Sequence, residues 1–198
     1  NTGRITTFLS TKGGVGKSVL AVNSALLLEK EFPGKTLLID TVTRFGSIDI
    51  LVDLNNKRSI AMIPQSVESQ ETYWQEISDN IIKLPSGLHV LCAGDRNEEP
   101  LNALKLRSIL NAVKEKYEQI VIDTESHLND VNQVLLDISD LVFFVSTLDL
   151  SSLKNLQAGL DSIKSLYFST DKIKIVLNRF EKDSELTIAE IEKYLKCK

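Results

Sequence analysis

A glycine-rich stretch near the start of the chain has the residue types that bind phosphate. Residues 10–18 read Ser-Thr-Lys-Gly-Gly-Val-Gly-Lys-Ser and follow a short apolar run. Closely spaced glycines let backbone N–H groups curve around phosphate oxygens, and a helix that begins directly after them adds partial positive charge. Lys17 would reach the β- and γ-phosphates of a nucleotide, and Ser18 would place its hydroxyl on Mg²⁺. The alternative is a glycine-rich turn with two solvated lysines, which the strand-loop-helix context disfavours.

Two aspartates end apolar runs and could act at the same site. Asp123 closes the run 119–123, and Asp40 closes the run 35–40. The carboxyl ends of parallel strands meet at one edge of a sheet, where a carboxylate can hold the Mg²⁺ that accompanies bound phosphates. We therefore expect Ser18 and Asp123 to be the metal ligands. Because an aspartate at a strand end is more often a helix cap or turn residue, this assignment depends on the phosphate loop.

The elements that must position these residues alternate between short apolar strands and amphipathic helices. Most of the predicted strands are rich in Val, Ile and Leu without strict alternation, which is typical of a parallel sheet buried on both faces. The helices carry apolar side chains at spacings of three and four. Together they predict a doubly wound α/β fold with a mostly parallel sheet, the P-loop NTPase fold. Strands are expected at 4–10, 35–40, 88–92, 119–123, 140–146 and 172–178, and helices at 17–31, 70–82, 101–117, 151–166 and 186–195.

Length, composition and charge suit one globular domain. The chain has 198 residues, of which 42% are hydrophobic and 25% charged, an ordinary mix for a folded domain. The net charge of -4 disfavours nucleic acid as a partner, and membrane contact is expected to be at most indirect or through segments outside this chain. Cys92 and Cys197 match no zinc, iron–sulfur or secreted disulfide pattern. They favour a reducing cytoplasm.

The phosphate loop resembles the deviant Walker A loop of the MinD/ParA class of P-loop ATPases. Thr11 stands where the standard pattern has glycine, and the loop begins with an additional lysine, Lys12. In that class this lysine reaches across an ATP-sandwiched dimer, where it offsets the charge of the partner's phosphates. The resemblance implies ATP or ADP with Mg²⁺ as ligands and self-association as a homodimer. It assigns nucleotide binding to Gly13, Gly14, Val15, Gly16, Lys17, Ser18 and Val19.

One position departs from the class. Two residues after Asp40, the class usually has a second aspartate that orients the attacking water, but this chain has Val42. A valine can neither accept a proton nor orient a water, and losing such a group typically lowers the rate by about 100-fold or more. We therefore expect ATP binding with slow or absent hydrolysis. Glu125 and Asp49 are left as candidates to replace the missing acid. The resemblance assigns catalytic roles to Lys12, Lys17 and Asp40.

Asn178 and Arg179 follow the last predicted strand, where the class has an Asn-Arg pair that contacts the adenine base. An asparagine amide offers both a donor and an acceptor to the edge of adenine. The alternative is an asparagine that makes a turn at the strand end. The resemblance therefore implies that Asn178 and Arg179 bind the base.

Further segments of the chain resemble the CpaE/TadZ proteins, ATPase-like components of type IVb (Tad/Flp) pilus assembly. They are residues 45–54, 59–61, 85–91 and 146–155. This resemblance implies a localisation and assembly factor that dimerises on ATP and binds pilus and secretion proteins at the inner membrane or cell pole. Such proteins often carry a receiver-like domain before the ATPase domain and a further strand and helix after it. Since the chain begins at Asn1, we expect residues 1–198 to be a single P-loop domain of a longer protein.

Two other interpretations stay open. A MinD- or ParA-type ATPase would cycle in membrane-site or DNA-segregation positioning, and salt-dependent retention on DNA would favour it. A scaffold that keeps only the fold would lack affinity for ATP. The intact Lys12, Lys17 and Ser18 argue against the loss of nucleotide binding, whereas Val42 argues against fast turnover.

Overall fold

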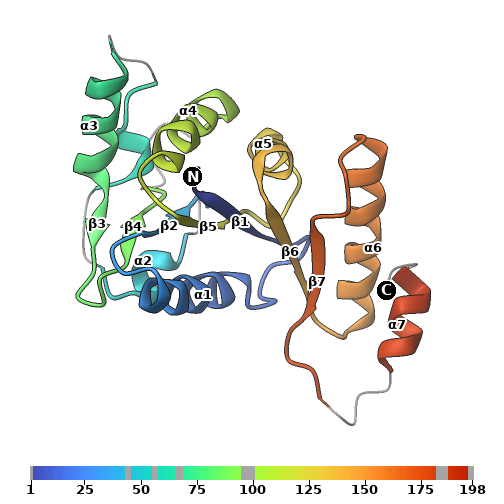
Figure 1. Ribbon diagram of the computed structural model, residues 1–198. Coiled ribbons are helices and arrows are strands. Elements are labelled where there is room, and N and C mark those ends of the chain that lie inside the picture. The colour runs from blue at the N-terminus through green and yellow to red at the C-terminus, as the bar shows by residue number, and fades with distance from the viewer. Residues whose placement is uncertain are drawn as a thin grey trace.

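A mostly parallel sheet runs through the molecule (Figure 1). The computed structural model describes residues 2–42, 46–54, 58–65, 69–94, 101–181 and 187–195. Within these ranges the strand order is β3-β4-β2-β5-β1-β6-β7, and every neighbouring pair is parallel except β3 and β4. The predicted doubly wound α/β fold is confirmed. The strands are β1 (Arg4–Leu9), β2 (Thr36–Asp40), β3 (Ile82–Lys83), β4 (His89–Leu91), β5 (Gln119–Asp123), β6 (Leu141–Ser146) and β7 (Ile173–Leu177).

Helices cover both faces of this sheet. On one face, α1 (Lys17–Glu31) and α2 (Ile48–Leu51) pack against side chains such as Phe8 and Val121. The other face carries α3 (Gln70–Asn80), the 3-10 turn η1 (Ile60–Met62), α4 (Ala103–Lys114), α5 (Asp130–Ile138) and α6 (Leu150–Ser165), and α7 (Ile188–Leu195) packs there beside α6 (Figure 1).

Burial on both faces explains the composition of the central strands. Leu37, Leu38 and Ile39 of β2 are all fully buried although consecutive side chains point to opposite faces. Burying each such side chain contributes about 1.5–3 kcal/mol. The absence of alternation in the sequence of β2 therefore reflects two packed faces.

Several elements differ from the sequence prediction. α5 is missing from it, although Asn129 caps this helix by accepting a hydrogen bond from the Asn132 N–H at 2.8 Å. The short elements β3, α2 and η1 were also not predicted, because two to four residues carry no periodicity. Cys197 and the first residue of the segment 45–54 lie outside the described residues.

Among the described helices, none combines the length and the apolar character that crossing a lipid bilayer would need.

Candidate functional site

The glycine-rich loop joins the end of β1 to the start of α1, as the sequence predicts. Gly14 and Gly16 have positive φ angles of 76° and 90°, a conformation that costs little only for glycine. Space is limiting as well at Gly16, since a Cβ there would lie 2.2 Å from Nδ2 of Asn178. The sequence therefore places glycine where the turn into α1 requires it.

The start of α1 is built differently from the other long helices. Polar side chains cap α3, α4, α5 and α6, namely those of Ser69, Asn102, Asn129 and Asp149. Within the described residues, α1 has no side-chain cap and no acidic residue in its first turn. The first N–H groups of a helix need partners and carry partial positive charge. The start of α1 is therefore suited to an anion such as phosphate.

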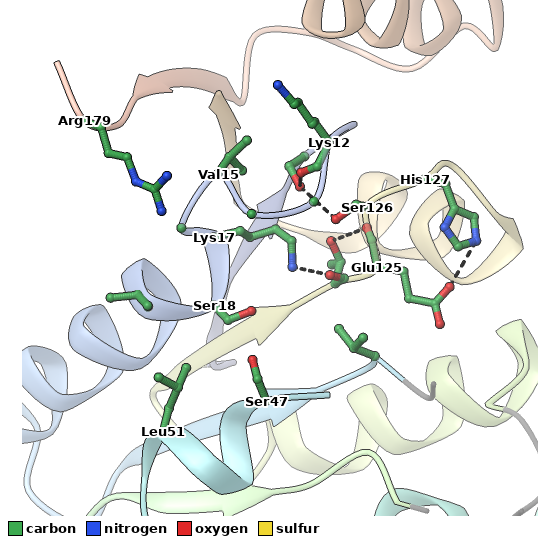
Figure 2. A pocket seen from close by; sticks show the side chains of 17 residues that line it. Lys12, Val15, Lys17, Ser18, Ser47, Leu51, Glu125, Ser126, His127 and Arg179 are labelled. Atoms are coloured by element: carbon green, nitrogen blue, oxygen red, sulfur yellow. Dashed lines mark hydrogen bonds and ion pairs between the residues drawn. The ribbon is translucent and has the colours of Figure 1, made fainter. Parts of the chain in front are cut away.

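A pocket of about 680 Å³ opens at this loop, at the carboxyl edge of the sheet (Figure 2). Of the residues that the sequence assigned to nucleotide binding, residues 13–19 and Arg179 line this pocket, whereas Asn178 does not. The wall consists of Ser10, residues 12–19, Val42, Ser47, Leu51, residues 124–127 and Arg179.

Lys17 and Asp123 form a buried ion pair beneath the pocket. The Lys17 Nζ lies 2.6 Å from Oδ1 of Asp123 and also donates to the Thr124 carbonyl. Lys17 is 6% exposed and Asp123 is fully buried. Breaking a buried pair of this kind leaves one charge without compensation, which costs about 3–5 kcal/mol. Lys17 is thus held at the pocket floor by groups that must release it before it can bind an anion.

Asp40 lies beside Asp123, because β2 and β5 are adjacent and these two residues are paired in register. Its Oδ1 accepts a hydrogen bond from the Val42 N–H at 2.8 Å. Burial, and then the charge of Asp123, raises the pKa of Asp40 to about 7, although N–H groups and the Lys17 charge oppose this. The structure therefore brings together the two carboxylates that the sequence selected, but Asp40 is buried rather than on the pocket wall.

The residues predicted to hold Mg²⁺ have the chemistry that this ion needs. Oδ2 of Asp123 is buried without a hydrogen-bond partner among the described residues, and an unpaired carboxylate oxygen of this kind is costly. Ser18 contributes to the pocket wall above it. Mg²⁺ prefers oxygen ligands from one or two protein side chains together with substrate phosphates. Ser18 and Asp123 therefore fit a magnesium site completed by phosphate.

Lys12 points away from Lys17 and contacts α6 of its own chain (Figure 2). Its Nζ lies 2.8 Å from Oδ1 of Asp149 and 3.0 Å from Oγ of Ser152. The Lys12 hydrogen bond is the main reason that the pKa of Asp149 lies well below its usual range, and hydrogen bonds from Ser152 and Thr147 add to it. Both partners are partly exposed, so the pair is weak compared with Lys17–Asp123.

Asn178 and Arg179 take different positions. The Asn178 amide donates to the Val15 carbonyl at 2.8 Å, which ties the end of β7 to the phosphate loop. Arg179 has a positive φ of 56° and lies on the pocket wall, on the other side of the loop from Glu125 and His127 (Figure 2). Contact of both residues with a base therefore stays a prediction, and Asn178 has a structural role in addition.

The pocket wall also contains residues outside the phosphate loop that the sequence did not assign to nucleotide binding. Ser47 directly precedes α2 and Leu51 ends it, and the sequence marked them only as members of the segment 45–54. Glu125 and His127 follow β5, and the His127 Nε2 lies 3.1 Å from Oε2 of Glu125. Of the two acids considered as replacements for the missing aspartate, Glu125 is on the pocket wall. Asp49 is exposed on α2, where it accepts a hydrogen bond from the Ile50 N–H.

Comparison with known proteins identifies a family and several relatives of this chain. Residues 3–175 match a protein family described as an AAA domain. The septum site-determining protein MinD of Thermotoga maritima is 24% identical over 183 residues, which are 90% of this chain and 65% of MinD. The chain spans about two thirds of the length of the first curated relatives that it matches.

Solved structures share the fold. A ParA family ATPase from Chlorobium tepidum superposes with a TM-score of 0.86 at 23% identity, over 99% of this chain and 81% of that protein. A putative plasmid partition protein from Borrelia burgdorferi, bound to AMPPNP, gives a TM-score of 0.74 at 27% identity over the same shares of the two chains.

Proposed function

Because the chain belongs to the AAA domain family and has MinD and ParA family proteins among its relatives, we propose that it is a nucleotide-switched ATPase of the MinD/ParA type. It binds ATP with Mg²⁺, associates with a second copy while ATP is bound, and separates after hydrolysis. The observation that carries this proposal is the uncapped start of α1 above a buried lysine–carboxylate pair. These groups lie at the edge of the sheet where such folds bind ligands.

The pocket divides the binding of a triphosphate among its residues. The loop N–H groups and the start of α1 hold phosphate oxygens. Lys17 exchanges its contact with Asp123 for contacts with phosphate, which is a stronger charge-assisted partner for a lysine. Ser18 and Asp123 supply oxygen ligands to Mg²⁺, which neutralises phosphate charge when it is bound. Arg179 lies on the opposite wall, and we expect it to contact the base.

Lys12 supports the proposed homodimer. Its ammonium is held by Asp149 in a partly exposed pair, which is worth about 0.2–1 kcal/mol. Phosphates that approach from a second copy can therefore replace Asp149 at low cost. Asp149→Asn keeps a residue that caps α6 well but removes the charge that holds Lys12. We expect this variant to dimerise with ATP up to about five-fold more tightly.

For the cellular role of this switch, we favour positioning at a membrane site or in DNA segregation over pilus assembly. Septum site-determining proteins and a putative plasmid partition protein are among the relatives and structural neighbours, and the pilus role rests on the resemblance of a few segments alone. The net charge of -4 favours a protein partner over direct DNA binding. Retention on DNA that requires ATP and falls steeply with salt would point instead to direct binding.

The test measures ATP binding by calorimetry with Mg²⁺ and the molar mass by light scattering with and without ATP. We expect micromolar or tighter binding and a doubling of mass with ATP. Lys12→Ala should still bind ATP, because Lys12 contacts Asp149 at the start of its own α6 and not the buried pair. It should stay monomeric, because the lysine that would meet the partner's phosphates is gone. Lys154→Ala is the control, because it removes one positive charge from the exposed surface of α6. This variant should dimerise like the parent.

Two results would refute the proposal. Failure to bind ATP would leave only the fold in common with the family. Binding without a change of mass, in the parent and the control alike, would exclude the dimer as the switched state.

A further inference from the structure

The acid that the family supplies at position 42 has a candidate replacement in the segment that follows the neighbouring strand, β5. Building on the proposed function, we infer that Glu125 orients the water that attacks the γ-phosphate. It is a catalytic residue of this chain, in place of an aspartate at Val42. Four observations carry this inference: the register of β2 and β5, the pocket wall, the contacts that hold Glu125, and the position of the competing acid.

The register places positions 42 and 125 side by side. Asp40 and Asp123 are paired where β2 and β5 end, and the Thr41 N–H still donates to the Asp123 carbonyl at 3.0 Å. Val42 and Glu125 are each two residues beyond that pair, on the chain segments that directly follow two adjacent strands. Glu125 thus supplies a carboxylate from the segment after β5, two residues beyond the same strand pair as Val42, which has none.

Both positions also face the same cavity. Val42 and Glu125 line the pocket that contains Lys17, Ser18 and the loop glycines. The Lys17 ammonium contacts the carbonyl of Thr124, the residue directly before Glu125. Glu125 thus directly follows the carbonyl that contacts Lys17 at the pocket floor, and its carboxylate is turned toward His127 (Figure 2).

Neighbouring side chains hold the Glu125 carboxylate in one orientation. Its Oε2 lies 3.1 Å from Nε2 of His127 and accepts a hydrogen bond from Nδ2 of Asn129 at 3.3 Å. Asn129 is itself fixed as the cap of α5. The Glu125 side chain is 17% exposed, so it is reached by water but is not freely solvated. A group that orients a water needs this kind of preorganisation.

Asp49 does not have these properties. It lies on the exposed side of α2 and its carboxylate accepts the N–H of Ile50. It is absent from the pocket wall.

The step needs no further reactant. The water oxygen forms a bond to the γ-phosphorus while the bond between that phosphorus and the β–γ bridging oxygen breaks. The electron pair stays on the bridging oxygen of ADP, and the water protons leave on the dihydrogen phosphate product. Glu125 accepts a hydrogen bond from the water, and this contact orients the water so that a lone pair of the water oxygen points at the phosphorus.

The test compares four proteins in single-turnover hydrolysis of Mg·ATP, with the ATP dissociation constant measured for each. Glu125→Gln keeps the shape of the side chain but removes the anionic acceptor. We expect its hydrolysis rate to fall about 100-fold, while the dissociation constant stays within about two-fold of the parent. Val42→Asp added to Glu125→Gln should restore most of the rate, because it returns an acid to the adjacent strand. Asp49→Asn, the matched control, should hydrolyse like the parent.

The outcomes separate this inference from the proposed function. If ATP binds and the dimer forms but Glu125→Gln hydrolyses like the parent, Glu125 is not the residue and the proposed function stands. The inference is equally overturned if the parent binds ATP without any hydrolysis, or if Glu125→Gln weakens ATP binding as much as it slows the rate. If ATP does not bind to the parent, the proposed function itself fails.

Discussion

Asp40 makes the stability of the ligand-free protein depend on pH in an unusual direction. Its carboxyl is 2% exposed, and burial and then the Asp123 charge raise its pKa from 3.8 to about 7. Between these two values the unfolded chain releases the Asp40 proton while the folded protein keeps it. The unfolded state then binds fewer protons, so the free energy of unfolding falls as pH rises.

The perturbation that isolates this effect is Asp40→Asn, which keeps the side-chain shape but cannot ionise. From the two pKa values, Asp40 lowers the free energy of unfolding by about 2.5 kcal/mol between pH 5 and pH 8. The parent should therefore lose about that much relative to the variant over this interval. A constant offset from the changed hydrogen bonds does not enter, because the comparison is between slopes.

Urea unfolding at pH 5, 6, 7 and 8, with EDTA and without nucleotide, measures both slopes. Parallel curves for the parent and Asp40→Asn would refute the reasoning, since Asp40 would then ionise in the folded protein as it does in the unfolded chain. A curve for the variant that falls more steeply than that of the parent would refute its sign.

Two further predictions concern the floor of the pocket and its loop. Lys17→Met should lower the free energy of unfolding by about 3–5 kcal/mol, because Asp123 is left buried without its partner. Adding Asp123→Asn should recover most of that loss in urea unfolding. A double variant as unstable as Lys17→Met would contradict the buried-pair argument. Gly16→Ala should cost at least about 1–2 kcal/mol, because φ is 90° and the new Cβ would lie 2.2 Å from the Asn178 amide. Gly13→Ala is the matched control for thermal unfolding, since a Cβ there meets nothing within 4 Å, and equal losses in the two variants would exclude the clash.

The sequence was sufficient for the features that are local. Apolar runs predicted the central strands, and the spacing of Gly14, Gly16 and Lys17 predicted the loop between β1 and α1. Asp40 and Asp123 could be placed together because the ends of parallel strands share one edge. These inferences need only periodicity and the residue types at strand ends.

The features that depend on distant parts of the chain could not be predicted. Lys12 and Asp149 are 137 positions apart, and nothing near either residue indicates their contact. Ser47 directly precedes α2 and lies on the pocket wall, a position that depends on how α2 packs against the sheet. Glu125 could be named as an acid in the sequence, but its preference over Asp49 needed the register of β2 and β5.

The central position of β1 has a consequence for how the protein is made. β1 is synthesised before the other strands of this sheet, yet its two partners are β5 and β6, which begin at Gln119 and Leu141. The Asn178 amide that fastens the phosphate loop is 163 positions from Val15. Contacts of such long range form late and slowly. During synthesis β1 therefore lacks its partners in the sheet until β5 has been made, and the phosphate loop lacks its contact with Asn178 until β7 has been made.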